Sequence, residues 1–500
     1  MSIGAIFNSA STSLAAQRAA LDVTSENISN VNTEGYSRQR VIMETGPTIT
    51  KNGLPVGGGV YVASVQRIYD DVLNKQINDG TSLQGNNDAK LQTLQQVEPY
   101  LNEISGNSIG DAMQGLSDSW QSLSLNPAGI SERQTVLGKA QILVDTFHQV
   151  SGGIINAQNF ADQSLTAVAT DVTAKAKEIA DLNTQIKMTE MANGNANELR
   201  DRRDLLIQNL SKQVGVSYTE QSDGMKVTLL GGETLVSGAQ YATLYTNKVG
   251  SGVTTNEIRI TAAGAPPSTT NPAGDVNVTA TIGGSNNSKG AIGGLLYARD
   301  TAMPAYLGKL DELAYNLSYQ INTQHAAGWN LNNTTGQAFF SPAAGSTAPP
   351  ALPADYAGYS SSIALAKKSS NPLVDIDTND IAAADTNPLT GGIGNNKNAL
   401  LLAGVANTQV AFSGGVMSTT ANFYNSLVAN IGVDVQGSKN LSAQNEAFVR
   451  QLNNLRASNS GVSLDEELTN LIKYQKAFEG ASKVISTASQ MMDTLLGLIR

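Results

Sequence analysis

The chain has 500 residues, no cysteine, 32 basic against 42 acidic residues and a formal net charge of -10. Without cysteine it forms no disulfide, no thiol nucleophile and no thiolate metal site. The acidic balance argues against nucleic acid or an acidic membrane surface as the main partner, and no window has the apolar length of a membrane span.

The first thirty residues predict an amphipathic helix. Alternating steps of three and four residues place apolar side chains on one stripe, which is the spacing of a helix that packs along a partner helix. The stripe runs through Ile3, Phe7, Ala10, Leu14, Gln17, Leu21, Thr24, Ile28 and Val31. The Asn-rich stretch before Gly35 predicts the end of this helix. Tyr36 to Ile49 and Val60 to Ile68 then read as extended segments around a turn rich in Gly and Pro.

Helical periodicity dominates residues 91 to 210. Residues 157 to 189 carry an apolar stripe at heptad spacing and predict one long rod-like helix. Asn126-Pro127 and Gly194 predict interruptions on either side of it.

From about Val214 to Ile282 the period changes to short alternating runs separated by Gly and Pro, which predicts a β-rich insertion. Helical periodicity returns from Gly290 to Gln324 and again from Asn398.

The C-terminal segment predicts a second amphipathic helix. The same stepping from Leu464 gives Leu464, Leu468, Leu471, Gln475, Phe478, Ser482, Ile485, Ser489, Met492, Leu496 and Ile499. Two such stripes at opposite ends of a long chain indicate that the termini pair with each other and with neighbouring molecules. The alternative is that both are ordinary amphipathic helices packed on a globular core.

These patterns predict an α+β fold, mainly α, with nested discontinuous domains. The terminal helices pair as a coiled-coil-like stem, and the middle of the chain loops out from it. The expected parts are a terminal helical domain of residues 1–40 plus 460–500, a helical rod domain of 41–213 plus 290–335 plus 398–459, a β-rich inserted outer domain of 214–289, and an irregular Pro/Ala/Ser-rich segment of 336–397.

The sequence shows no catalytic constellation and predicts no cofactor. His148 and His325 are far apart, and no zinc-protease His pair, phosphate-binding loop or nucleophile elbow occurs. Asp375 begins a run that resembles a calcium loop, but Asp380 stands where Gly is needed and Thr386 where Glu is needed.

Residues 27–36 read Asn-Ile-Ser-Asn-Val-Asn-Thr-Glu-Gly-Tyr. This run resembles the N-terminal signature that bacterial flagellar rod, hook and hook-associated proteins share, and Ser37-Arg38-Gln39 resembles the hook-associated members. Four more segments resemble motifs of those members, namely residues 197–204, 293–300, 322–328 and 461–467. Matched positions run from residue 2 to residue 500, with the β region least similar.

The resemblance implies a structural adaptor at the hook-filament junction that assembles on the hook tip and supports filament growth. It implies a secreted protein, exported unfolded by the flagellar type III apparatus without a cleavable signal peptide. The implied partners are itself in a ring-like homo-oligomer, the hook protein, the third hook-associated protein and filament-side subunits, and an export chaperone that covers Leu468 to Leu498 before export. No nucleic acid and no membrane insertion is implied.

The expected assembly interface combines the two stripes with the signature motif. It comprises Phe7, Leu14, Leu21, Ile28, Asn30, Asn32, Gly35, Tyr36, Leu464, Leu468, Leu471, Phe478, Ile485, Met492, Leu496 and Ile499. Gly35 and Tyr36 are expected to cap a helix and also to form a hinge between the inner tube and the outer helical domain. Because polar residues interrupt both stripes, we expect the ends to be disordered in the monomer and to fold on docking.

Three alternative functions differ in what they require. Another flagellar axial protein, such as a hook or distal rod protein, disagrees with Ser37-Arg38-Gln39 and with the long helical region. A secreted coiled-coil adhesin needs a signal peptide or an anchor, and neither is apparent. A cell-wall hydrolase needs catalytic groups, and none is evident.

Overall fold

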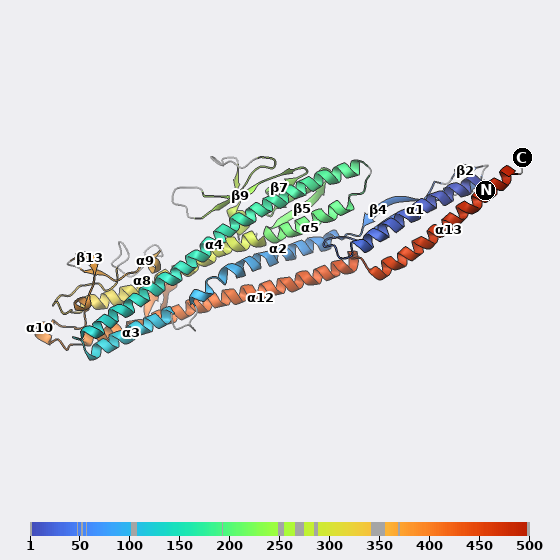
Figure 1. Ribbon diagram of the computed structural model, residues 1–500. Coiled ribbons are helices and arrows are strands. Elements are labelled where there is room, and N and C mark those ends of the chain that lie inside the picture. The colour runs from blue at the N-terminus through green and yellow to red at the C-terminus, as the bar shows by residue number, and fades with distance from the viewer. Residues whose placement is uncertain are drawn as a thin grey trace.

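A computed structural model gives the fold of the chain. It describes residues 3–47, 49–51, 54–56, 58–101, 108–192, 194–248, 255–265, 275–284, 289–341, 356–368 and 371–497. The molecule is elongated, and both chain ends lie together at one extremity (Figure 1). Helices dominate and the sheets are small and antiparallel, which confirms the predicted α+β, mainly α fold.

Long helices run along the body of the molecule. The longest has 62 residues and extends for about 90 Å at 1.5 Å per residue. The helices of the body are α2 (Asp71–Leu94), α3 (Ile109–Leu125), α4 (Ile130–Met191), α5 (Asn197–Gln213), α7 (Gly290–Tyr297), α8 (Met303–Ala327), α11 (Lys397–Ala403) and α12 (Thr420–Ser460). The predicted rod of residues 157–189 is the second half of α4, which the Asn126-Pro127 turn separates from α3.

Helix α2 has no counterpart in the sequence-based expectations. It packs along α12, α7 and α5. Two glycines allow this approach, because a Cβ on Gly85 would lie 2.0 Å from the carbonyl oxygen of Lys212 and one on Gly294 would lie 2.2 Å from that of Asn86. Backbones at this distance leave no room for the large apolar side chains that mark an ordinary buried helix.

The inserted β region packs against the outer side of α4 (Figure 1). One sheet has the order β5-β6-β7-β8 and another β11-β10-β9. The strands are β5 (Val216–Gln221), β6 (Gly224–Leu229), β7 (Thr234–Ser237), β8 (Gln240–Tyr241), β9 (Leu244–Asn247), β10 (Glu257–Ile260) and β11 (Val276–Asn277). Asn183 of α4 anchors the first sheet, because its Nδ2 donates to the carbonyl oxygens of Met225 and Gly238, both at 2.9 Å.

Two large hydrophobic clusters stabilise the body. One joins α4, α5 and α7 to the β region, and the other joins α3, α4, α8, α11 and α12 at the end far from the chain termini. Two short elements, α6 (Thr279–Gly283) and the π-helical η3 (Ala298–Ala302), lie nearer the β region. The other short elements surround the second cluster: η1 (Glu98–Leu101), α9 (Tyr359–Ser362), β12 (Lys367–Lys368), β13 (Asn371–Asp375), η5 (Thr378–Asp380), α10 (Pro388–Gly391), η6 (Val405–Asn407), β14 (Val410–Phe412), η7 (Ser413–Gly415) and β15 (Val416–Ser418).

The two chain ends form a separate extension of the body, here called the terminal arm. It consists of α1 (Ile3–Ser29) and α13 (Leu464–Gly497), which lie side by side and antiparallel (Figure 1). A hairpin of β1 (Gln39–Thr45) and β4 (Val60–Arg67) lies along α1, and β2 (Ile49–Lys51) and β3 (Leu54–Val56) pair beyond it. Neither large hydrophobic cluster includes a residue of the arm.

Candidate functional site

The seam of the terminal arm is narrow and rich in alanine. From α13, Ala481 and Ala488 are buried, and Leu471, Phe478 and Ile485 are half-buried. The buried residues of α1 are Ala10, Ala16, Ala20, Thr24 and Asn27. Small side chains let two helices approach closely, but they bury little apolar surface. The pair therefore gains less from apolar burial than the clusters of the body do.

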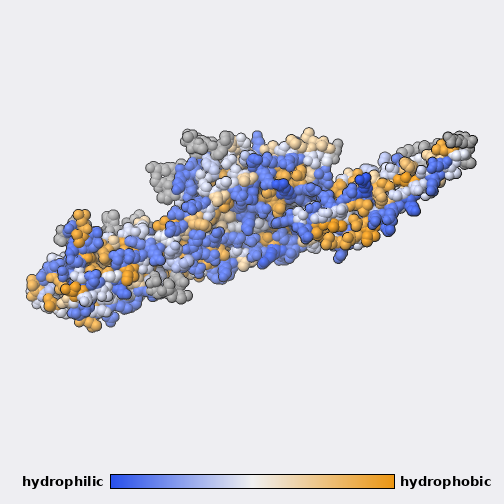
Figure 2. Space-filling model, viewed as in Figure 1, coloured by the Kyte–Doolittle hydropathy of each residue, from blue (hydrophilic) through white to orange (hydrophobic). Residues whose placement is uncertain are grey.

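The face of α13 that points away from α1 exposes large apolar side chains. Leu468 is 49% exposed and Ile472 is 58% exposed. Figure 2 shows this apolar surface where α13 begins, at the base of the arm. Leu464, Leu468 and Ile472 lie on one flank in the first turns of α13, whereas the exposed Val484, Met491, Met492, Leu495 and Leu496 lie further along and on other sides of the helix. Contiguous exposed apolar surface of this kind marks a site of association.

The structure covers only part of the predicted C-terminal stripe. Leu471, Phe478 and Ile485 point toward the seam, whereas Leu464, Leu468, Met492 and Leu496 are exposed. Of the predicted alternate positions, Gln475 and Ser489 are exposed and Ser482 is half-buried. The residue before each of them, Tyr474, Ala488 and Ala481 respectively, points toward the seam instead. Ile499 lies outside the described residues.

The predicted N-terminal residues are mostly half-buried. Leu14, Leu21 and Ile28 lie partly against neighbouring elements, whereas Phe7 is exposed near the end of the arm. Of the signature motif, Asn30, Gly35 and Tyr36 line a cleft at the base of the arm, and Asn32 is exposed.

A buried hydrogen-bond network holds the elements at the base of the arm together, and sequence reasoning did not find it. Asn27 on α1 is its centre. Its Nδ2 donates to the carbonyl oxygen of Gln39 at 2.8 Å and to Glu467 Oε2 at 3.3 Å. Its Oδ1 accepts from the Gln39 amide and the Tyr36 hydroxyl, both at 2.9 Å. One side chain therefore ties together α1, β1, the loop that follows α1, and α13.

Arg38 ties the start of α13 to the same place. Its Nε lies 2.6 Å from Glu467 Oε1, its NH1 lies 2.6 Å from Glu466 Oε2, and its amide donates to the carbonyl oxygen of Ser460 at 2.9 Å. Glu467 is 2% exposed and Arg38 is partly buried, so solvent screens this pair less than a surface ion pair. The only sequence signal for it was the acidic first turn of α13.

On the body side, α5 supplies two buried carboxylates. Asp201 accepts from the Ser37 amide at 2.9 Å, and Arg67 NH1 lies 2.9 Å from Asp201 Oδ1 and 2.6 Å from Asp204 Oδ2. Burial raises the pKa of both carboxyl groups, while Arg67 acts in the opposite direction. This region is the helix start that resembled a family motif, and its carboxylates hold the β1–β4 hairpin and the loop after α1.

A second pair of carboxyl groups bridges the arm and the body. The side chains of Glu26 on α1 and Glu198 on α5 share a hydrogen bond. This contact, together with burial, raises the pKa of Glu26 to about 7. Burial, followed by the charge of Glu26, also raises the pKa of the Tyr36 hydroxyl.

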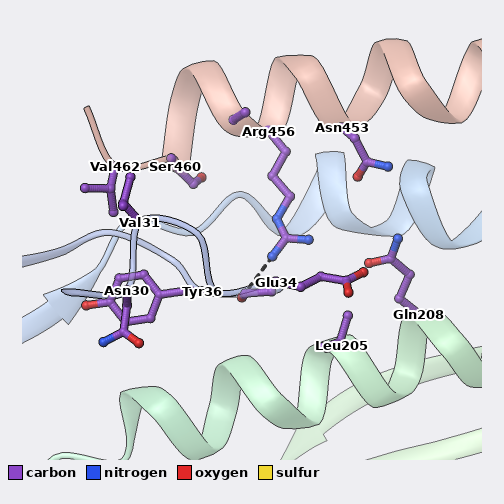
Figure 3. A pocket seen from close by; sticks show the side chains of 13 residues that line it. Asn30, Val31, Glu34, Tyr36, Leu205, Gln208, Asn453, Arg456, Ser460 and Val462 are labelled. Carbon is purple, nitrogen blue, oxygen red and sulfur yellow. Dashed lines mark hydrogen bonds between the residues drawn. The ribbon is translucent and has the colours of Figure 1, made fainter. Parts of the chain in front are cut away.

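A cleft of about 290 Å³ lies where the arm meets the body. In Figure 3 the chain segment after α1 forms one wall, Leu205 and Gln208 of α5 form another, and Arg456 and Asn453 of α12 reach in from the third. Arg456 NH2 donates to the carbonyl oxygen of Gly35 at 3.1 Å. Gly35 has φ +83°, and a Cβ there would lie 3.1 Å from that of Leu205, so the predicted hinge position needs glycine.

The described residues show neither a metal site nor a membrane span. No group of three or more His, Cys, Asp or Glu side chains among them is arranged to hold an ion. No described helix is long and apolar enough to cross a bilayer. His325 is buried and fully hydrogen-bonded, and His148 bonds a backbone carbonyl oxygen.

An arm built from both chain ends, fixed to a long helical body and apolar on its outer face, defines a structural protein that assembles with other subunits. Three family models agree with this class. The helical domain of flagellar hook-associated protein FlgK matches residues 94–340, the flagellar basal body rod protein family matches 7–36, and the C-terminal family of the flagellar basal body rod FlgEFG proteins matches 456–498.

Full-length relatives narrow the class. Flagellar hook-associated protein 1 of Bacillus subtilis is 29% identical over 97% of this chain and 96% of its own length. The protein of the same name from Escherichia coli is 27% identical over 99% of this chain and 100% of its own length. The solved flagellar hook junction protein FlgK from Burkholderia pseudomallei has the same fold, with a TM-score of 0.64 at 17% identity, over 77% of this chain and all of that one.

The chain therefore belongs to the flagellar hook-associated protein 1 family. It is a structural, hook-associated component of the bacterial flagellum that interacts with other axial components, as the sequence motifs predicted. The family is a structural one, in agreement with the expectation that the chain is not an enzyme.

Proposed function

We propose that the chain forms the adaptor between hook and filament, as a ring-like homo-oligomer whose terminal arms line the inner tube. The body and the inserted β region then form the outer part of the ring. The hook protein lies on one side of this ring, and the third hook-associated protein and filament-side subunits lie on the other. Gly35 and the cleft beside it form the joint between the inner and outer parts.

The observation that carries this proposal is the outer face of α13. Leu464, Leu468 and Ile472 are each about half exposed, although a helix that packs only on α1 has no need of them. A second copy that packs on this face buries them, at about 25 cal/mol per Å² of apolar surface removed from water. These residues lie in the first turns of α13, at the base of the arm, where side-by-side packing of neighbouring arms around an axis covers them.

We also propose that the arm is marginally stable in the isolated chain and is stabilised by assembly. Its seam is built largely of alanine, and neither hydrophobic cluster of the body extends into it. Its links to the body include the polar contacts of Ser37 and Arg67 with α5 and of the Arg38 amide with α12. An arm of this kind opens easily, which suits export of an unfolded chain through the type III apparatus to the outside of the cell.

The same apolar face suits an export chaperone. Before assembly, α13 presents exposed apolar side chains from Leu464 to Leu496 that favour aggregation in the cell. A chaperone that covers Leu468 to Leu498 before export removes this hazard, and its release leaves the helix free to pair with α1 and with neighbouring copies.

Deletion of Leu464 to Arg500 tests the proposal in cells with intact hooks. The expected result is that filament subunits accumulate as monomers in the medium while hooks remain normal in number. The control is Leu389→Gln in α10, an exposed side chain at the opposite end of the molecule (Figure 1). Normal attached filaments after deletion of α13 would overturn the proposal.

A further inference from the structure

Arg456 is a cation without an ion-pair partner among the residues that the structure describes. It reaches from the last turns of α12 into the cleft at the base of the arm (Figure 3). Among the residues that the structure describes, its guanidinium group bonds only the carbonyl oxygen of Gly35. The nearby carboxylate of Asp204 is engaged by Arg67, and Glu34 lines the same cleft without coming within 4 Å of Arg456.

Asp465, at the start of α13, is an acidic residue without an ion-pair partner among the described residues. The first turn of α13 carries three acidic residues, and Arg38 pairs with Glu466 and Glu467. Asp465 is exposed, and its carboxylate makes no ion pair with a described residue. Acidic side chains stabilise a helix N-terminus in general, but that effect requires no partner and leaves the carboxylate free to bind a cation.

Arg456 and Asp465 both lie at the junction of α12 and α13. Arg456 and Asp465 flank the short connector between α12 and α13, nine positions apart in the sequence. A ring operator relates points at equal height along its axis, and in a head-to-tail ring residue i of one subunit meets residue j of the next. The acidic partner of Arg456 in a neighbouring copy must therefore come from the level of this junction.

We propose that the cleft at the base of the arm receives Asp465 of a second copy of this chain, which pairs with Arg456. The pairing rests on the proposed ring and names its lateral contact. Asn453 and Gln208 line the cleft beside Arg456 and supply further hydrogen-bond donors to an incoming carboxylate. Because the cleft walls come from the loop after α1, from α5 and from α12, a side chain in it also holds the arm at a fixed angle to the body.

The absence of native cysteine makes a crosslinking test unambiguous. Cells express two single-cysteine variants together, Arg456→Cys and Asp465→Cys, and isolated hooks with bound protein are treated with a short bis-maleimide. We expect crosslinked two-chain species in the mixed cells and none in cells with either variant alone. Protein present on the hooks without mixed crosslinks would overturn the pairing. Absence of the protein from hooks, for the wild type as well, would instead overturn the proposed function.

A charge exchange provides the functional test. Arg456→Glu and Asp465→Arg each place like charges at the contact, and we expect each to raise the filament subunit shed into the medium about tenfold, the change that the loss of one charge-assisted contact gives. The double variant R456E/D465R is expected to return shedding to the wild-type level. Arg450→Glu, on the same helix but paired with Glu446, is the matched control.

A purely structural role of Arg456 would show as a lower melting temperature of the purified chain. We expect Arg456→Gln and Glu34→Gln to melt at the wild-type temperature instead. If Arg456→Glu sheds filaments but Asp465→Arg neither sheds them nor rescues it, the partner is not Asp465 and the pairing is wrong.

Discussion

The Nδ2 atom of Asn27 lies 3.3 Å from Oε2 of Glu467, a residue 440 positions further along the chain. Asn27 is 1% exposed and Glu467 is 2% exposed. Because Asn27 also bonds both backbone groups of Gln39, a single amide fixes the place where the first helix, the first strand and the last helix meet. Asn27 thus holds the base of the arm together, and contacts of Ser37, Arg38 and Arg67 with α5 and α12 link that base to the body.

Asn27→Ala is expected to loosen the arm without unfolding the body. It leaves the buried Gln39 amide without its acceptor and removes one of the hydrogen bonds of the Glu467 carboxylate, at a cost of about 2–4 kcal/mol. Hydrogen exchange of α1 and α13 should accelerate, while amides of α4 keep their protection. Asn8→Ala, at an exposed position of the same helix, is the control, and equal exchange in both variants would contradict the role given to Asn27.

Gly35→Ala is expected to destabilise the joint by about 1–2 kcal/mol, the cost of a left-handed conformation for a residue with a Cβ. The close approach to Leu205 adds to this cost. Gly138→Ala, in the third turn of α4 with nothing near its Cβ, should instead stabilise by about 0.5–1 kcal/mol. Urea unfolding of both variants measures the difference, and a neutral Gly35→Ala would show that the joint does not need glycine.

Acid is expected to destabilise the body through His325. Burial lowers the pKa of His325 to about 4, from an ordinary value of 6.5. In the folded chain Nε2 accepts from the Ala382 amide at 2.9 Å, so the ring stays neutral while the unfolded chain takes up a proton. Stability from this group is complete above pH 6.5 and is lost as the pH falls toward 4, by about 3 kcal/mol in total.

Urea unfolding between pH 7 and pH 4.5 checks this dependence. His325→Gln should be less stable than the wild type at pH 7, and the difference should shrink as the pH falls. The control is His148→Gln, at the exposed histidine. A difference between wild type and His325→Gln that stays constant over this range would contradict the assignment.

The Glu26 and Glu198 pair gives the opposite pH dependence. The Glu198 side chain, with burial, raises the pKa of Glu26 from its ordinary value of 4.5 to about 7. Between these two pH values the folded chain therefore keeps a proton on Glu26 that the unfolded chain has released. This contribution to stability is present at mildly acidic pH and is lost as the pH rises through 7. Glu198→Gln should therefore raise the melting temperature of the arm at pH 8 and leave it nearly unchanged at pH 5. A uniform shift at both pH values would contradict the shared proton.

The apolar stripes predicted both helices of the arm, but only half of their seam. Leu471, Phe478 and Ile485 are strongly apolar and face α1 as expected. The alternate seam positions are Ala481 and Ala488, whose small side chains are weak signals beside leucine or methionine on the neighbouring face. Close packing of α1 and α13 selects the alanines, and the larger residues are left outside for other subunits.

The elements that sequence reasoning missed depend on contacts between distant segments. Helix α2 is buried through Gly80 and Gly85, and glycine is a poor helix former on its own. The joint depends on Asn27, Arg38 and Glu467, which no local period links. The signature motif marked this region through Asn27 and Tyr36, but only the fold shows that they bond each other.

The most direct test of the account concerns the outer face of α13. The double variant Leu468→Gln, Ile472→Gln removes exposed apolar surface without touching the seam, and the exposed pair Met188→Gln, Met191→Gln on α4 is its control. The measurement is the filament subunit shed into the medium by cells with intact hooks, alongside thermal unfolding of each purified chain. We predict that both double variants melt like the wild type and that only the α13 variant sheds its filaments. Firmly attached filaments on cells that carry the α13 variant would contradict the claim that this face joins the subunits.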